Sequence, residues 1–541
     1  MKKLLVCLIV FINIIFNSSY ADTLDDYTLD DFACSYYEEI ITQIDSLIEQ
    51  EMYEEAEVEL EKLYNSSCKT LDATKKYIFV LNKLQKVNKA YQIAEANELL
   101  DSDIGLLIQA EKNIPIKDYT QARSVYDNIL IKTPYDKFAQ MGLTHSYISE
   151  GSELKALQEL KRLPETNDIQ YLKAKAYYNL ELFEDAYKIL KTLPQTDEVL
   201  ELENEIKRKR AYQFVSGYEL YVQKLNEEYK MDANKILFSN SCYEKNLQVY
   251  FDYILFIYTS GVLQGQGPEP LNDVTNEIRL GTQGRLNEKI ALRADIGVKA
   301  FQQYGVMLLT DTWVKYYVND AFNVKLGFHR NNTEQSFLSA VGVNIDGRFT
   351  GQVADNNLYL DMTYRLPKRS YVFTKGGIGA KDGYNMPSDL YWEGMFGIGK
   401  LIRYDLTKPY LQKVSLDLVS YQSGYEFNLQ NLYDKQGLLY GGFFSPKWYS
   451  DNTVNMNFAG KIKNTNFSYG FGAFAGWQFA LSPDQSLFIY GASVDGKYRL
   501  NDHISFELQY RYYKYANITR NQFLFDLVIS LFKKEGQLAK K

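Results

Sequence analysis

Two different spacings of apolar residues divide the chain. From residue 31 to about residue 210, apolar side chains recur three and four positions apart in stretches of about 12 to 18 residues, separated by short polar turns. From about residue 245 the spacing changes to two, in segments of roughly ten residues bounded by Gly, Asn, Asp and Pro. The first spacing is that of amphipathic helices, and the second is that of strands with one apolar face. The sequence therefore predicts a helical half followed by an antiparallel sheet.

The helical half contains an internal repeat. Three prolines stand just after apolar helix ends at intervals of 30 residues, namely Pro134, Pro164 and Pro194. Such a period indicates stacked helix pairs, about five in number, and a generic antiparallel helical bundle is the alternative. In the clearest unit, Ala122 lets a paired helix approach and Tyr126 lies one turn further on the same face. Its motif residues, which resemble the second helix of a tetratricopeptide repeat, are Tyr119, Ala122, Tyr126 and Pro134.

The second half alternates with a period of two. Near the C-terminus, Ile504, Phe506 and Leu508 alternate with Ser505 and Glu507. We count about sixteen such segments, the last ending at residue 532, and an even number of strands fits a transmembrane barrel. A soluble antiparallel sandwich alternates in the same way, but charges on strand after strand and an aromatic-rich apolar face favour the barrel. The predicted fold is an α-solenoid followed by an antiparallel β-barrel of about 16 strands, wide enough for an aqueous channel.

The polar face of these strands is predicted to line the channel. The predicted lumen-facing charges are Arg293, Asp295, Lys299, Asp361, Arg365, Lys413, Asp417, Asp495, Lys497, Arg499, Glu507 and Arg511. A channel for a strongly charged polymer should carry a field of the opposite sign. Because both signs occur almost evenly here, the sequence favours a neutral cargo that moves by transient hydrogen bonds and stacking.

The N-terminus and the composition indicate export to an outer membrane. Lys2 and Lys3 precede an apolar run from Leu4 to Phe16 and a small, polar end at Ala21, which is the order of a signal peptide. No later stretch offers about 20 consecutive apolar residues, so helical membrane spans are not expected. The 46 tyrosines fit the aromatic girdles of membrane barrels. We expect the repeats in the periplasm and the barrel in the outer membrane.

Charge and pattern together set the expected domain boundaries. These are a signal peptide at 1–21, helical repeats at 22–210, a linker at 211–244, the barrel at 245–532 and a tail at 533–541. Residues 22–210 hold 37 acidic and 23 basic side chains, whereas residues 211–541 hold 31 and 35. With a pI near 5.3 and no basic stripe, nucleic acid is not an expected partner.

The residue types needed for metal or covalent chemistry are sparse. The only histidines are His145, His329 and His503, far apart in the sequence, and no CxxC pair occurs. We therefore expect no enzyme, no cofactor, no metal site and no catalytic residues. Cys34 and Cys68 either form one bridge in an oxidising compartment or are simply buried.

Two stretches carry a family resemblance. Residues 334–342 and 347–353 form the first stretch, and residues 440–449 form the second, with Gly-Phe-Phe-Ser-Pro-x-x-Tyr at Gly442 to Tyr449. Both resemble the C-terminal barrel of the cellulose synthase operon protein C family, although the repeat array here is shorter. The matching residues are Ser336, Ser339, Gly342, Gly351, Gly442, Phe444, Ser445, Pro446 and Tyr449. We favour a structural role for them over direct sugar contact, since proline cannot donate to a central ladder.

The resemblance implies an outer-membrane pore that exports an extracellular polysaccharide. Together with the mixed lumen charge, it indicates a neutral, cellulose-like glucan. The expected partners are the polysaccharide chain, outer-membrane lipid, and periplasmic or inner-membrane synthase components held by the repeats. The alternatives are a translocator of surface proteins or lipoproteins, an exporter of another polysaccharide such as poly-N-acetylglucosamine, and a simple porin with a scaffold. Loops at 265–272 and 428–436 are candidates to plug the pore.

Overall fold

The computed structural model describes most of the chain between Tyr37 and Phe532. The described residues are 37–50, 52–66, 68–84, 86–113, 119–133, 136–225, 229–260, 271–302, 305–345, 348–367, 369–404, 410–427, 443, 445–463, 465–481, 485–515 and 518–532. The expected signal peptide, tail and plugging loop at 428–436 lie outside them, as does most of the loop at 265–272, and so do Cys34, Pro134, Gly442 and Phe444. The chain divides into two compact units, which we call the helical unit, up to Glu150, and the barrel unit, from Gly151.

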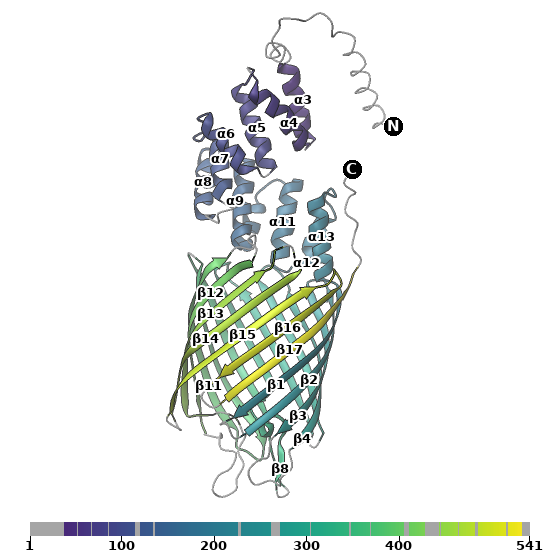
Figure 1. Ribbon diagram of the computed structural model, residues 1–541, viewed down its shortest axis with the longest axis vertical. Helices are drawn as coiled ribbons and strands as arrows, with labels where there is room; N and C mark the ends of the chain where they lie inside the picture. Colours follow the sequence, from purple (N-terminus) through teal and green to yellow (C-terminus); the bar gives the residue numbers. More distant parts are fainter. Residues whose placement is uncertain are drawn as a thin grey trace, which may run out of the picture. The chain divides into compact units, whose positions relative to one another are not determined.

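The helical unit is a series of short helices, each packed on the next (Figure 1). Its described helices are α3 (Tyr37–Glu49), α4 (Tyr53–Asn65), α5 (Leu71–Lys83), α6 (Val87–Ala96), α7 (Asp103–Asn113), α8 (Tyr119–Lys132) and α9 (Lys137–Glu150). They run for 10 to 14 residues, somewhat shorter than the spacing suggested. Cys68, next to α5, is disulfide-bonded, whereas Cys242 in the barrel unit is free. None of the described helices is long and apolar enough to cross a membrane.

The repeat motif on α8 forms the contact with its neighbours. Ala122, Tyr126 and Ile129 are fully buried. The hydroxyl of Tyr126 donates to Glu111 Oε1 on α7 at 2.5 Å. Its ring lies against Gly142 on α9, where a Cβ would come within 2.3 Å of the ring. Tyr126 therefore links α7, α8 and α9, as expected of helix pairs stacked through one shared core.

Four further described helices stand at the start of the barrel unit, ahead of its strands, and they form two closely similar pairs. They are α10 (Glu153–Leu160), α11 (Asn167–Asn179), α12 (Phe183–Leu190) and α13 (Asp197–Lys209). After α10 and after α12 the chain makes the same turn, with the amide of Thr166 bonded to Pro164 O at 2.9 Å and that of Thr196 bonded to Pro194 O at 2.9 Å. The 30-residue spacing of these prolines is thus a structural period, and the prediction of helical repeats is confirmed.

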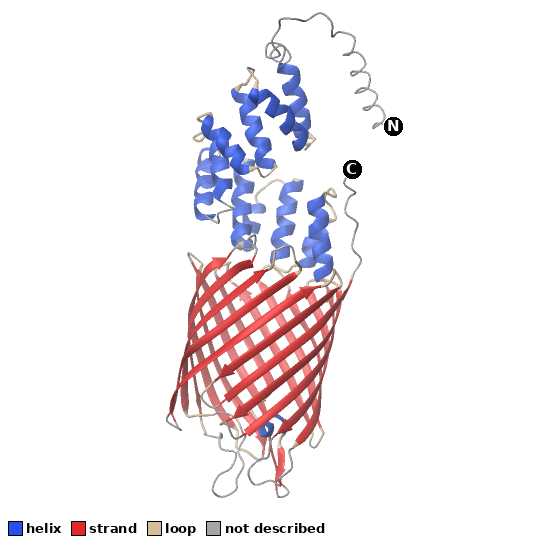
Figure 2. Ribbon diagram, viewed as in Figure 1, coloured by secondary structure: helices blue, strands red, loops and turns tan. Residues whose placement is uncertain are grey.

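The strands of the barrel unit form one closed antiparallel sheet (Figures 1 and 2). They are β1 (Tyr212–Leu225), β2 (Tyr229–Glu244), β3 (Leu247–Ser260), β4 (Asn272–Arg285), β5 (Ile290–Phe301), β6 (Val306–Tyr317), β7 (Phe322–Asn332), β8 (Val343–Ile345), β9 (Arg348–Leu366), β10 (Ser370–Tyr384), β11 (Asp389–Tyr404), β12 (Tyr410–Tyr425), β13 (Trp448–Lys461), β14 (Phe467–Leu481), β15 (Gln485–Arg499), β16 (Ile504–Lys514) and β17 (Ile518–Leu531). The short β8 pairs with the start of β9, and the remaining sixteen described strands make the wall.

The wall closes where the first strand meets the last. β1 pairs with β17 from Tyr212 opposite Leu531 to Leu225 opposite Ile518. The predicted barrel of about 16 strands is confirmed, but the predicted linker at 211–244 is wrong. These residues form β1 and β2, so two wall strands lie ahead of residue 245 and fourteen follow it.

The two faces of the wall differ as the alternation predicts. On β5, Ile296 and Val298 are 58% and 42% exposed, whereas the neighbouring Asp295 and Lys299 are buried. Exposed Leu, Ile, Val, Phe, Tyr and Trp side chains recur in this way on the other strands. An apolar outer band of this kind is what a lipid-facing surface requires.

One end of the barrel carries short turns, and they bind α10 and α12. The β6–β7 turn presents Asp320, whose carboxylate accepts from the amides of Leu154 and Lys155 at 2.9 Å each. The β2–β3 turn presents Asn246, whose Oδ1 accepts from the amide of Glu184 at 2.8 Å. Neither helix has a side-chain cap of its own. The barrel turns therefore supply the acceptors that helix N-termini need.

Candidate functional site

The predicted lumen charges all occupy strand positions that alternate with the exposed apolar side chains. Arg293, Asp295 and Lys299 lie on β5, Asp361 and Arg365 on β9, and Lys413 and Asp417 on β12. Asp495, Lys497 and Arg499 lie on β15, and Glu507 and Arg511 lie on β16. These charges share the inner face of the wall. The residues that follow β7 pack against that same face.

Several of these charges are paired with the opposite sign across neighbouring strands. Arg293 lies 3.0 Å from Asp295 Oδ2 and 3.2 Å from Asp311. Asp361 lies 2.6 Å from Lys325 on β7. Lys497 pairs with Glu507, and Asp417 accepts from the hydroxyl of Tyr371. Because partners sit side by side, these charges cancel locally.

Arg365 does not belong to this network. It lies at the short-turn end of β9, where its Nη1 donates to Gly151 O at 3.2 Å. This hydrogen bond therefore joins Arg365 to the residue just before the helices of the barrel unit. We read Arg365 as a residue that holds the helices to the barrel.

The first signature stretch builds a segment that folds against the inner wall. Ser336 and Ser339 form a reciprocal cap, in which the amide of Ser339 donates to Ser336 Oγ at 3.2 Å and that of Ser336 donates to Ser339 Oγ at 2.9 Å. They open the short helix α14 (Phe337–Val341), which Figure 2 shows as a blue helix behind the strands near the end where β8 lies. We call residues 333–342 the inner segment.

Two glycines let the inner segment turn and pack. Gly342 has φ of +78° and Gly351 has φ of +98°, a region that favours glycine. A Cβ on Gly351 would lie 2.2 Å from the carbonyl oxygen of Leu338. The predicted structural role of the first signature stretch thus has a geometric basis in the approach of Gly351 to α14.

The apolar side of the inner segment packs on several strands. Phe337, Leu338 and Val341 are buried in one cluster with side chains of β1, β2, β3, β5, β6 and β9. The wall members of this cluster are Tyr221, Met231, Ala233, Phe256, Tyr258, Phe301, Met307, Leu309 and Ala354. A segment packed on this many strands occupies part of the cross-section of the barrel.

Glu334 anchors the polar side of the inner segment. Its Oε1 lies 3.1 Å from Lys299 Nζ and its Oε2 lies 3.0 Å from Lys235 Nζ. The hydroxyls of Tyr258 and Tyr221 donate to the same carboxylate at 2.9 and 3.1 Å. Two cations and two hydroxyls therefore compensate one carboxylate whose side chain is 20% exposed, which is the condition for stable partial burial of charge.

Sequence reasoning found Lys299 but missed its partners. Glu334 lies within the first signature stretch without a predicted role, and Lys235 falls in the segment assigned to a linker. Tyr221 is 113 residues from Glu334 along the chain, and Arg520, which donates to Glu334 O at 3.3 Å, is 186 residues away. No local pattern could reveal contacts of this range.

The second signature stretch packs against β9 and β12 and leads into β13. Phe443 and Ser445 are fully buried, and Pro446 O accepts from the amide of Tyr425 at 3.3 Å. The ring of Phe443 lies 6.4 Å from that of Tyr425. Tyr449 is the second residue of β13, and its ring lies 5.6 Å from that of Tyr421. Pro446 stands just before a strand and donates nothing, as expected for proline beside a sheet.

A further network on the inner wall joins charge to tyrosine. Tyr391 donates to Asp355 Oδ1 and accepts from Asn357, each at 2.7 Å. Its ring stacks on that of Tyr425 at 5.3 Å. Glu393 Oε1 pairs with Lys375 at 2.5 Å. This part of the wall presents tyrosine rings and neutralised charges, which suit hydrogen bonding and stacking better than ion binding.

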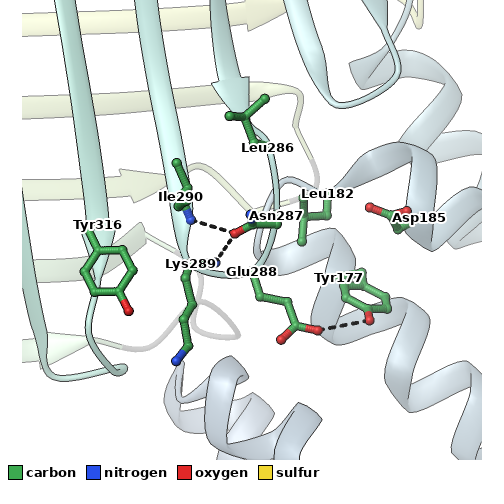
Figure 3. A pocket seen from close by; sticks show the side chains of 9 residues that line it. All are labelled: Tyr177, Leu182, Asp185, Leu286, Asn287, Glu288, Lys289, Ile290 and Tyr316. Atoms are coloured by element: carbon green, nitrogen blue, oxygen red, sulfur yellow. Dashed lines mark hydrogen bonds between the residues drawn. The ribbon is translucent and has the colours of Figure 1, made fainter.

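The short-turn end of the unit holds a cavity of about 570 Å³ between α11, α12 and the β4–β5 turn (Figure 3). Tyr177 donates to Glu288 Oε1 at 3.2 Å, and Lys161 pairs with the same carboxylate at 3.2 Å. Burial and the neighbouring Glu288 raise the pKa of Tyr177 to about 12. Leu286 and Tyr316 complete the lining with outer-face side chains. We call this the α11 cavity.

The described residues contain no group of three or more His, Cys, Asp or Glu side chains placed to hold a metal ion. The arrangement on the inner wall is one of paired charges, hydroxyls and rings around a channel.

Comparisons with known proteins give structural similarities only. No family model matches the chain, and no curated protein matches it. A bacterial polysaccharide outer membrane secretin shares 12% identity over 58% of this chain and 98% of its own, with a TM-score of 0.41. A tetratricopeptide repeat protein from Parabacteroides merdae shares 17% identity over 31% and 69%, with a TM-score of 0.27. The translocator domain of the autotransporter NalP from Neisseria meningitidis shares 8% identity over 60% and 89%, with a TM-score of 0.26.

Proposed function

We propose that this protein is an outer-membrane pore that exports a polysaccharide, namely a neutral, cellulose-like glucan. The observation that carries the proposal is the inner wall, where charges stand in opposite pairs beside tyrosine rings. A neutral polymer of hydroxyls and sugar faces finds hydrogen-bonding partners and stacking surfaces on such a wall. A strongly charged polymer would find no opposing field.

The orientation follows from the two ends of the barrel. Barrels of this class place short turns in the periplasm and longer loops outside the cell. The short turns here bind α10 and α12, so the helices would lie in the periplasm. Stacked repeats offer extended binding surfaces, and we assign them the role of holding the emerging polymer or the synthase that makes it.

The inner segment would control passage. It packs on the wall through α14 and is held by Glu334, so a polymer must pass beside it or displace it. The residues of this segment include Ser336, Ser339 and Gly342, which carry the resemblance to cellulose exporters. The resemblance and the position of the segment in the channel support the same proposal.

A deletion strain complemented in trans would test the proposal. We expect deletion to abolish extracellular glucan while the polymer accumulates in the periplasm, and the full chain to restore export. The same strain complemented with a variant that lacks residues 22–150 keeps the barrel unit with α10 to α13 and shows whether the helical unit is required. Unchanged glucan outside the deletion strain would overturn the proposal.

The same strains distinguish the alternatives. Loss of surface lipoproteins without loss of glucan would indicate a protein translocator, and loss of passive uptake alone would indicate a porin. The composition of the missing polymer, glucose or N-acetylglucosamine, separates the two polysaccharide readings.

A further inference from the structure

A second cavity lies at the seam where the barrel closes. It measures about 510 Å³ and is lined by Tyr187, Ile206, Lys207, Arg210, Ala211, Tyr212, Leu531 and Phe532. Its residues come from α12, from α13 and the residues after it, and from the ends of β1 and β17. We call it the seam cavity.

One side of the seam cavity belongs to the outer, lipid-facing surface of the wall. Tyr212 and Leu531 are direct register partners across the seam, and they are 45% and 59% exposed. Both end the outward apolar rows of their strands at the short-turn end. Tyrosine at such a position marks the boundary between hydrocarbon and headgroups in membrane proteins. The cavity therefore lies at headgroup level, on the opposite face of the wall from any cargo.

The other side of the seam cavity is cationic. The ring of Tyr187 is approached by Lys191, Lys207 and Arg210, with 5.3, 5.7 and 5.8 Å from the charged groups to the ring centre. Two carboxylates form ion pairs with these three cations. Glu203 Oε1 lies 2.6 Å from Lys191 and 3.1 Å from Lys207, and Glu184 lies 2.6 Å from Arg210. Three cations against two carboxylates leave an excess of positive charge.

One hydrogen-bond donor of the Arg210 guanidinium has no acceptor among the described residues. Its Nη2 pairs with Glu184, but its Nε is buried and has no hydrogen-bond partner among the described residues. A buried guanidinium donor without an acceptor is costly, so an acceptor is expected there. An oxygen of a phosphate group is the acceptor that suits guanidinium best.

We propose that the seam cavity binds the headgroup of an anionic phospholipid. The phosphate accepts from Arg210 and is attracted by Lys207, while an acyl chain follows Leu531 and Tyr212 along the outer wall. A single basic side chain near a membrane surface contributes roughly 1 kcal/mol to the binding of anionic lipid. A lipid bound here would contact α12 and α13 as well as β1 and β17, the first and last strands of the wall.

The α11 cavity offers an internal comparison. It also combines outer-face side chains with groups from the helices, but its charged lining includes the carboxylates of Asp185 and Glu288 beside a single Lys289. It has no excess of cations, and we therefore assign the anionic lipid to the seam cavity alone.

Native mass spectrometry of the full chain in detergent would test the proposal, with phosphatidylglycerol as the probe and phosphatidylcholine as the uncharged comparison. We expect the wild type to retain one phosphatidylglycerol in preference to phosphatidylcholine. K207Q/R210Q should lower that retention at least tenfold, since two cations are lost. K209Q is the matched control, because Lys209 belongs to the same basic cluster but is exposed and does not line the cavity; it should leave retention unchanged.

A second variant addresses the loss of the Arg210–Glu184 pair, which could disturb α12 directly. Leu531→Ala keeps every charge and removes part of the acyl contact, so retention should fall by a smaller factor with the helices intact. Equal retention by K207Q/R210Q and K209Q would overturn the proposal. The proposal would also be overturned if the wild type retained phosphatidylcholine as well as it retains phosphatidylglycerol, or if inorganic phosphate displaced all of the bound phosphatidylglycerol. None of these outcomes depends on the cargo of the pore.

Discussion

Lys299 and Glu334 lie 35 residues apart in the sequence and meet inside the barrel, with 3.1 Å between Nζ and Oε1. Lys299 is fully buried on β5, and Glu334 belongs to the inner segment. Removing one partner of a buried ion pair leaves an uncompensated charge, which costs about 3 to 5 kcal/mol. This ion pair therefore stabilises the inner segment in its position on the wall.

Glu334→Gln should loosen the inner segment. Lys235 and Lys299, both on wall strands, would then lose the carboxylate that they share, and the inner segment would lose its ionic attachment to the wall. We expect larger and noisier single-channel conductance in planar bilayers and greater sensitivity of cells to bulky antibiotics. Asp361→Asn is the matched control, since it breaks the Lys325 pair on the wall without touching the segment. Equal conductance in the two variants would contradict the role of Glu334 in holding the inner segment on the wall.

Gly351→Ala should displace the same segment by a steric route. The new Cβ would meet Leu338 O at 2.2 Å, and φ of +98° is unfavourable for alanine, at a cost of about 1 to 3 kcal/mol. We expect faster proteolysis within residues 333–342 and a lower melting temperature. Gly376→Ala serves as the control, because nothing lies within 4 Å of its Cβ position. If both variants resist protease like the wild type, the close approach of Gly351 is not what holds α14.

The caps provided by the turns to α10 and α12 can be removed one at a time. Asp320→Ala and Asn246→Ala each delete the acceptor at a helix N-terminus, which costs about 1 kcal/mol per cap. Amide hydrogen exchange should become faster in the first turn of the helix concerned and stay the same in the other. Asn501→Ala is the control, since Asn501 caps only its own β15–β16 turn. Unchanged exchange in both helices would show that the turns do not hold them.

The barrel could be predicted from the sequence wherever its two faces differ in polarity. β5 and β16 alternate cleanly because one face meets lipid and the other meets paired charges. β2 does not alternate in this way, so a period of two does not reveal it. On its outer face, Asn240 and Asn234 accept from the hydroxyls of Tyr212 and Tyr218 at 2.7 and 2.6 Å.

The inner face of β2 departs from the pattern for a second reason. Met231 and Ala233 are apolar because the inner segment covers them. Tertiary contacts thus place polar side chains on the outer face and apolar ones on the inner face, beside Phe238 and Lys235, which follow the expected pattern, so neither face of β2 is uniform. The inner segment itself carries no periodic signal, since its position depends on Glu334 and on residues from six strands. Of that segment, the sequence singles out only the capping residues Ser336 and Ser339 and the glycine at 342.

Glu153→Gln tests the junction between helices and barrel through pH. Glu153 opens α10, and burial, together with the nearby Asp320, raises its pKa above the usual 4.5, although a backbone hydrogen bond opposes the shift. A carboxyl whose pKa is raised on folding contributes its stability below pH 4.5 and loses it as the pH rises through the folded value. At pH 7 the buried charge therefore weakens the junction, and glutamine should relieve it.

We expect slower amide exchange in α10 of Glu153→Gln than of the wild type at pH 7, after correction for the intrinsic pH dependence of exchange. The two proteins should converge at pH 4, where the wild-type carboxyl is protonated. Glutamine keeps an oxygen for Asn179 Nδ2, which donates to Glu153 Oε1 at 3.2 Å, so the hydrogen bond survives. Glu159→Gln, on the same helix and paired with Arg162, is the control, and its α10 should exchange at pH 7 as the wild type does. A wild-type α10 that is better protected at pH 7 than at pH 4 would contradict the sign of this argument.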